Sequence, residues 1–115
     1  MHRKVCVLWR QMKRAIETLS DYPPPGMEVR LIERYARIRG SRLLEIGCGD
    51  GRLTREVAPF VSSVVAFEPD REKVATAKQV AALEGLTNVS FRVGAAERLR
   101  VGGGPFDIAL FSWSL

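Results

Sequence analysis

The spacing of apolar residues changes near residue 40 of this 115-residue chain. Before it, apolar residues recur every three or four positions, as on one face of a helix. They are Val5, Leu8, Trp9, Met12, Ile16 and Leu19 in a first segment, and Leu31, Ile32 and Tyr35 in a second. Three consecutive prolines lie between the two segments and break any helix. The pattern predicts one amphipathic helix through the first segment and another over 27–39, ended by Gly40.

After residue 40, short apolar segments alternate with helical ones. The pattern predicts strands at 42–46, 63–67, 89–93 and 106–111. Helices are predicted over 52–60 and from Asp70 to Glu84, with Gly85 at the C-terminal end. Such alternation is typical of an α/β fold with a parallel sheet and right-handed crossovers. We therefore divide the chain into an N-terminal helical segment, 1–40, and a sheet-containing domain, 41–115.

Composition and charge are those of a globular domain. Apolar residues make up 46% and charged residues 27% of the chain. Residues 1–42 hold ten Lys/Arg and four Asp/Glu, so the basic excess is N-terminal; it is typical of a nucleic-acid contact or, as we favour, of a solvated helix face. No apolar run approaches the ~20 residues that span a bilayer. The two cysteines have neither paired nor zinc-type spacing, and we expect a cytoplasmic protein that does not enter the membrane.

The candidate chemistry lies in the turn between the first two elements of the domain, residues 47–51, here named the glycine loop. Gly47, Gly49 and Gly51 give it the spacing GxGxG. Glycines in a strand-to-helix turn allow unusual backbone angles and a close approach of a ligand. A dinucleotide fingerprint requires a further glycine at the position of Arg52, so a pyrophosphate-binding loop is disfavoured. The remaining alternative is a simple tight turn.

Glu68 follows Gly47 by 21 residues and lies at the end of the next predicted strand. A carboxylate at this place can accept hydrogen bonds from both hydroxyls of a ribose. The alternative is an acid on a solvent-exposed loop. Asp70, by contrast, precedes a helical segment and is predicted to be its N-cap.

Residues 42–115 resemble the class I S-adenosylmethionine-dependent methyltransferases. The run 45–51 matches the first motif of that family, which is an acidic residue, an apolar residue and GxGxG. Residues 64–70 are similar to the second strand with its ribose-binding acid, and 94–99 to the stretch that flanks the adenine. Residues 106–115 resemble the fourth strand and the start of the substrate-side motif. Ala95 is a departure, since family members often have an aspartate there.

The resemblance implies a Rossmann-like three-layer α/β sandwich with about four strands in the order 3-2-1-4, and S-adenosylmethionine as the cofactor. It assigns cofactor contacts to Glu45, Gly47, Cys48, Gly49, Gly51, Glu68, Pro69, Ala96, Glu97 and Ser112. Glu45 is expected near the methionyl ammonium, and Ala96 and Glu97 near the adenine. Cys48 is expected to be a small loop residue and not a nucleophile, because the chain contains a single histidine, His2. No metal ligand, general base or other catalytic residue is predicted.

The sequence ends directly after the fourth predicted strand, whereas the family's sheet ordinarily has seven. We therefore expect either a fragment or a partner, such as a second copy, that pairs with the apolar strand at 106–111. The predicted activity is methyl transfer to an unidentified acceptor, for which we favour a small molecule over RNA or protein. Two alternatives stay open: a module that binds the cofactor without transferring its methyl group, and a nicotinamide-dependent oxidoreductase, which Arg52 argues against.

Overall fold

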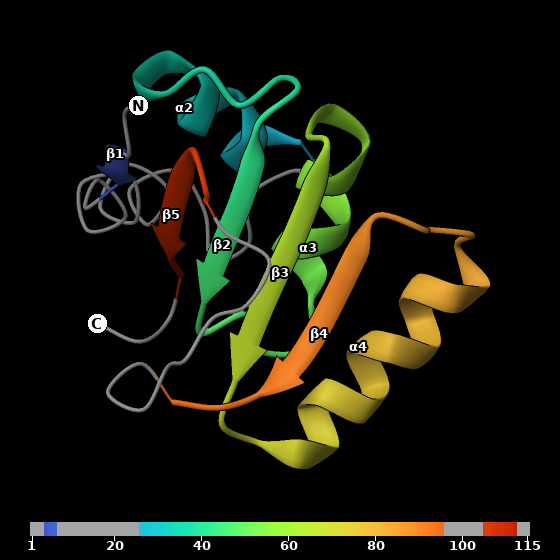
Figure 1. Ribbon diagram of the computed structural model, residues 1–115. Coiled ribbons are helices and arrows are strands. Elements are labelled where there is room, and N and C mark those ends of the chain that lie inside the picture. Colours follow the sequence, from blue (N-terminus) through green and yellow to red (C-terminus); the bar gives the residue numbers. More distant parts are fainter. Residues whose placement is uncertain (1–3, 7–25, 96–104, 113–115) are drawn as a thin grey trace.

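The computed structural model describes residues 4–6, 26–95 and 105–112, with the backbone alone for 4–6. In these ranges one parallel sheet has the strand order β1-β5-β2-β3-β4 (Figure 1). The strands are β1 (Lys4–Cys6), β2 (Arg42–Ile46), β3 (Ser63–Glu68), β4 (Val89–Val93) and β5 (Ile108–Phe111). The helices are α2 (Met27–Tyr35), α3 (Arg52–Val57) and α4 (Arg71–Leu83), with a 3₁₀ turn, η1 (Ala58–Phe60), after α3.

The order predicted for the four strands of the domain is confirmed. Strands β4, β3, β2 and β5 lie side by side in that order, which is 3-2-1-4 along the chain. Glu45 of β2 is in register with Ala66 of β3 on one side and with Leu110 of β5 on the other. All these pairings are parallel, so the C-terminal ends of the strands meet at one edge, the lower edge in Figure 1.

The predicted order 3-2-1-4 places the strand at 106–111 at an edge of the sheet, and the structure corrects this placement. Residues Lys4–Cys6 form β1, which pairs in parallel with Ile108–Leu110. These residues were expected to begin the first amphipathic helix. They form a strand instead, because the outer side of β5 has backbone N–H and C=O groups that a neighbouring strand can hydrogen-bond. The edge of β5 therefore provides no argument for a second chain, and residues 7–19 of the predicted helix lie outside the described ranges.

Three helices pack on one face of the sheet and share its main core. The strands contribute Leu43, Val64, Ala66, Phe91, Ile108 and Leu110, and the helices contribute Val29, Ile32, Leu53, Val57, Val74, Ala77 and Ala81. Ile46, Val65 and Phe67 belong to a second cluster on the opposite face. The division follows from the alternation of side chains along each strand. Glu45 therefore points to the helix-covered face, between the apolar residues of β2 and α3.

Helix α2 ends at Tyr35, four residues before its predicted end. Ala36 is already extended, with φ −147° and ψ 139°. Ala36 and Ile38 are both buried, whereas the residues that follow each of them are exposed. This period of two shows that an extended backbone buries both apolar side chains against the core. Gly40, with φ 73°, turns the chain into β2 and does not end the helix.

The other helices agree closely with their predictions. The segment 52–60 divides into α3 and η1 around Pro59, which has no N–H to continue an α-helix. Asp70 caps α4, as predicted, because its Oδ1 accepts hydrogen bonds from the amides of Glu72 (2.9 Å) and Lys73 (3.4 Å). Among the helices of the described ranges, none has the length and apolar character to cross a bilayer.

Candidate functional site

The glycine loop connects β2 to α3 at the C-terminal edge of the sheet. Gly47, Gly49 and Gly51 have φ values of 79°, 59° and 85°, in the left-handed region that favours residues without a Cβ. The amides of Gly47 and Cys48 both donate to the carbonyl of Phe67, at 2.8 and 3.0 Å. These two hydrogen bonds fix the start of the loop to the end of β3.

Gly49 and Gly51 are required for different reasons. No described atom outside its chain neighbours would lie within 4 Å of a Cβ at Gly49, so the loop backbone is open to a ligand there. A Cβ at Gly51 would lie 3.0 Å from two ring carbons of Phe91 and 3.1 Å from Cβ of Ala77. Gly51 therefore allows β4 and α4 to pack closely beneath the loop.

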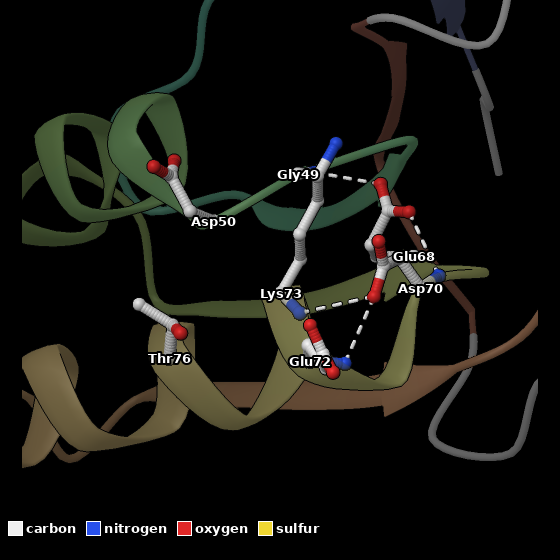
Figure 2. A pocket seen from close by; sticks show the side chains of 7 residues that line it. All are labelled: Gly49, Asp50, Glu68, Asp70, Glu72, Lys73 and Thr76. Atoms are coloured by element: carbon white, nitrogen blue, oxygen red, sulfur yellow. Dashed lines mark hydrogen bonds between the residues drawn. The ribbon is translucent and has the colours of Figure 1, made fainter.

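Glu68 ends β3 with its carboxylate held by two backbone amides. Its Oε1 accepts from the Gly49 amide and its Oε2 from the Asp70 amide, each at 2.9 Å (Figure 2). The residue is 9% exposed, which contradicts the alternative of an acid on an exposed loop. An ionised carboxylate offers about four lone-pair sites. With two of them used by the backbone, two remain for a ligand.

A pocket of about 560 Å³ opens beside this carboxylate. Its lining residues are Gly49, Asp50, Glu68, Asp70, Glu72, Lys73 and Thr76 (Figure 2). The glycine loop forms one wall, and the start of α4 forms the other. Four of these seven residues carry a carboxyl group, and Lys73 alone carries a positive charge. Like charges repel strongly at short range, so this lining disfavours the pyrophosphate of a dinucleotide.

Glu45 is fully buried beneath the loop. Its Oε1 accepts from the Thr54 hydroxyl and its Oε2 from the Ser112 hydroxyl, both at 2.6 Å. Burial raises the pKa of the Glu45 carboxyl, and the hydrogen bonds from Ser112 and Thr54 oppose that rise. The side chain therefore joins β2 to α3 and to the residue after β5. Its contact with a methionyl ammonium stays a prediction.

The other residues predicted to contact the cofactor do not all lie beside the Glu68 pocket. Ser112 is buried, and its amide donates to the Ile46 carbonyl at 2.9 Å, so its described contacts are to β2 and not to the pocket. Pro69 is exposed between two residues that line the pocket. Ala96 and Glu97 lie outside the described ranges.

Cys48 is a structural residue of the loop. Its side chain is buried, and the thiol donates to the Gly49 carbonyl with an Sγ–O distance of 3.6 Å. Burial, together with the nearby carboxylates of Glu45 and Glu68, raises the pKa of the Cys48 thiol to about 12. The thiol is therefore protonated at neutral pH, and the nucleophile is the thiolate. This geometry agrees with the expectation that Cys48 is not a nucleophile.

Arg52 stands where a dinucleotide fingerprint has glycine, and it makes two ion pairs. Its Nη2 lies 2.6 Å from Oε1 of the buried Glu28 on α2, and its Nη1 lies 2.9 Å from Oε2 of Glu56 on α3. The other oxygen of Glu56 accepts from the Gly26 amide at 2.7 Å. Arg52 thus ties the start of α2 to the helix that follows the glycine loop.

The sequence-based prediction missed Thr54 beneath the loop and four residues of the pocket lining, which are Asp50, Glu72, Lys73 and Thr76. Thr54 is a polar residue on the buried face of a short helix, and a buried hydroxyl requires a hydrogen-bond partner. The position of Thr54 in the sequence could therefore have predicted a buried hydrogen-bond partner for it. Lys73 had no signal, because its spacing does not distinguish it from Lys78, the other exposed lysine of α4.

The basic residues in the last turn of α2 and just after it lie away from this pocket. Arg34, Arg37 and Arg39 line a second pocket together with Tyr35. Its lining residues, 33–39, are the C-terminal end of α2 and part of the connection to β2, and Figure 1 shows this connection at the edge of the sheet where the strands begin, opposite the β2–α3 connection. The charge of these arginines therefore gives no support to an anionic ligand beside Glu68.

Comparisons with known proteins agree on one family. A family profile described as "Methyltransferase domain" matches residues 43–115. A ubiquinone biosynthesis O-methyltransferase from Caulobacter sp. (strain K31) is 40% identical over 72 residues, which cover 62% of this chain and 28% of that protein. A relative of the same name from Agrobacterium fabrum is 36% identical over 112 residues, 89% of this chain and 44% of that protein. The solved YcgJ protein from Bacillus subtilis is 30% identical with a TM-score of 0.68, covering 75% of this chain and 37% of that one. The chain spans less than half the length of each of these proteins.

Replacement of Gly51 by alanine tests the packing beneath the loop. We expect Gly51→Ala to lower the free energy of unfolding by about 2–5 kcal/mol, from about 1–2 for the left-handed backbone and about 1–3 for overpacking against Phe91 and Ala77. Gly85→Ala is the matched control, because Gly85 has φ 72° and open space around a Cβ. It should lose the backbone contribution alone. Equal losses in urea unfolding of the two variants would contradict the packing role.

The raised pKa of Glu45 predicts a pH dependence of stability. The folded protein binds the Glu45 proton more tightly than the unfolded chain, so stability falls as pH rises from the ordinary pKa of 4.5 through the raised value. Glu45→Gln removes this titration. We expect the stability of Glu45→Gln, relative to the wild type, to increase with pH in urea titrations from about pH 4 to about pH 8. The exposed Glu72→Gln controls for the loss of one carboxyl, and a constant or falling difference for Glu45→Gln would refute this account.

Proposed function

The chain belongs to the methyltransferase-domain family of S-adenosylmethionine-dependent methyltransferases, and we propose that it binds this cofactor beside Glu68 and transfers its methyl group to a hydroxyl of a small molecule. The observation that carries the proposal is the Glu68 carboxylate, which two backbone amides hold at the wall of the pocket. Its two remaining lone-pair sites match the two hydroxyls of a ribose.

The shape and charge of the pocket fit the rest of the cofactor. Gly49 leaves open space at the loop, so that the main chain and a ligand can come into contact. The surplus of carboxyl groups in the lining suits a ligand that carries a sulfonium and an ammonium better than one that carries phosphates. We assign the ribose to Glu68, the adenine to Pro69, Ala96 and Glu97, and the methionyl end to the loop residues Gly47, Cys48, Gly49 and Gly51. Glu45 and Ser112 would support the methionyl end from below.

When bound, S-adenosylmethionine supplies a methyl group that its sulfonium already activates toward displacement. The contribution of the chain is then to hold the cofactor in one orientation, and alignment of this kind supplies up to about 7–11 kcal/mol of barrier reduction. The hydrogen bonds of Glu45 with Thr54 and Ser112 hold the loop in a fixed position relative to the end of β5. Residues that receive the acceptor would follow β5 in the family's arrangement.

A hydroxyl is proposed as the acceptor because both relatives described above are named as O-methyltransferases of ubiquinone biosynthesis. A small molecule is favoured over RNA or protein for the same reason. The arginines of the second pocket lie at and after the C-terminal end of α2 and do not line the Glu68 pocket, so they do not argue for RNA at this site. A cytoplasmic location is also part of the proposal, on the cysteine usage of the chain.

Calorimetry with S-adenosylmethionine, S-adenosylhomocysteine and NAD tests the cofactor. We expect the first two to bind and NAD not to bind. Glu68→Gln should weaken binding about ten- to hundredfold, because its amide nitrogen cannot accept from a ribose hydroxyl or from the Gly49 or Asp70 amide that it faces, and an unpaired group of this kind costs about 1–3 kcal/mol. Glu72→Gln removes the same charge from the pocket without touching the loop, and it should have little effect. Binding of NAD alone would overturn the proposed function.

Methyl transfer is tested with cofactor labelled in its methyl group and two acceptors, a catechol and an aromatic amine of similar size. We expect label to appear as a methyl ether of the catechol, at a rate that falls in Glu68→Gln when the cofactor is below saturation. Label on the amine alone would refute the hydroxyl acceptor. Cofactor binding without transfer to either acceptor would favour the alternative of a binding module without catalytic activity.

A further inference from the structure

Among the described residues that line the Glu68 pocket, Lys73 is the one that carries a positive charge. It lies in the first turn of α4, where its amide donates to the N-cap carboxylate of Asp70 at 3.4 Å. This contact fixes the backbone from which the side chain starts. Figure 2 shows the side chain extending from α4 across the pocket toward the glycine loop, on the side of Gly49 and Glu68.

Without this lysine, the described side chains of the lining would offer many hydrogen-bond acceptors but, apart from Thr76, no donor. A ribose hydroxyl donates one hydrogen bond and accepts up to two, whereas an ionised carboxylate accepts only. Glu68 can therefore satisfy the hydroxyl hydrogens but not the hydroxyl lone pairs. Asp50, Asp70 and Glu72 have the same limit, and the Gly49 amide already donates to Glu68. Among the lining side chains that the structure describes, Lys73 and Thr76 alone can donate, and Lys73 has the longer reach and the charge.

We propose that Lys73 and Glu68 form a ribose-recognition pair, in which the carboxylate accepts from the ribose hydroxyls and the ammonium donates to a lone pair of at least one of them. The inference rests on the proposed binding of S-adenosylmethionine in this pocket. In this pair, the same ribose hydroxyl donates to Glu68 and accepts from Lys73. A ligand without that hydroxyl loses both interactions, so the pocket selects a ribonucleoside over a deoxyribonucleoside.

The lysine also explains how the pocket holds a neutral sugar among several carboxyl groups. Hydrogen bonds from a charged donor are roughly twice as strong as those between neutral groups. The ammonium offsets part of the repulsion among the acids of the lining, and it does so at the point where the sugar would lie. A methionine at this position would keep the length of the side chain but would supply neither donor nor charge.

The test is calorimetry of S-adenosylhomocysteine and its 2′-deoxy and 3′-deoxy analogues with the wild-type chain, Lys73→Met and Lys78→Met. Lys78 is exposed on the same helix and does not line the pocket, so its variant controls for the loss of one positive charge. The wild type should bind the parent compound about fifty- to hundredfold more tightly than at least one analogue, because that analogue loses the hydrogen bond to Glu68 as well as the one from Lys73. Lys73→Met should weaken the parent about five- to tenfold while leaving that analogue nearly unchanged. Lys78→Met should change all three affinities equally and by little.

Lys73→Arg, which keeps a charged donor, should recover part of the discrimination against the analogue. If Lys73→Met keeps the full discrimination of the wild type, or weakens all three compounds equally, the inference is wrong while the proposed function stands. If the wild type binds neither S-adenosylhomocysteine nor S-adenosylmethionine, the proposed function fails and the inference fails with it. The urea unfolding midpoint of each variant is compared with that of the wild type, and equal midpoints show that a loss of affinity does not come from unfolding of the variant.

Discussion

The rest of the site depends on one buried carboxylate, that of Glu45. A carboxyl group in an apolar core is tolerated when its oxygens are hydrogen-bonded, and here the partners come from α3 and from the residue after β5. Because β2 leads directly into the glycine loop, the same two hydrogen bonds determine where the loop begins and where the chain leaves β5. The loop then donates through Gly49 to Glu68. The position of the pocket acid is therefore set by contacts that start in the core.

The order of β2 to β5 could be predicted because each strand is a short apolar segment followed by a turn or a helix with clear end signals. The same reasoning failed at Lys4–Cys6 and at the end of α2. A short apolar segment fits a helix or a strand equally well, and the outcome depends on which partner is present. For Lys4–Cys6 the partner is the edge of β5, and for Ala36 and Ile38 it is the core beneath the connection to β2. Neither partner can be identified from local spacing.

The candidate site shows the same division. The spacing of the glycines and the place of Glu68 follow from the chain path of a strand, a turn and a helix, so sequence alone indicated them. The distinction between Gly49 and Gly51 did not follow, since both fit the motif equally. Only the packing of Phe91 and Ala77 shows that one faces open space and the other faces the core. The role of Lys73 likewise depends on which wall of the pocket α4 supplies.

Arg52, which replaces the last glycine of a dinucleotide motif, also holds α2 in place through its ion pair with Glu28. A glycine at this position would let a ligand come closer to the start of α3, but it would also remove both ion pairs that Arg52 makes. One of its partners, Glu28, is 2% exposed, and loss of the partner of a buried charge is strongly destabilising. The arginine is therefore required by α2 as well as being unsuited to a pyrophosphate-binding loop. The residue that argues against a dinucleotide in the sequence is, in the folded chain, the residue that holds α2 against α3.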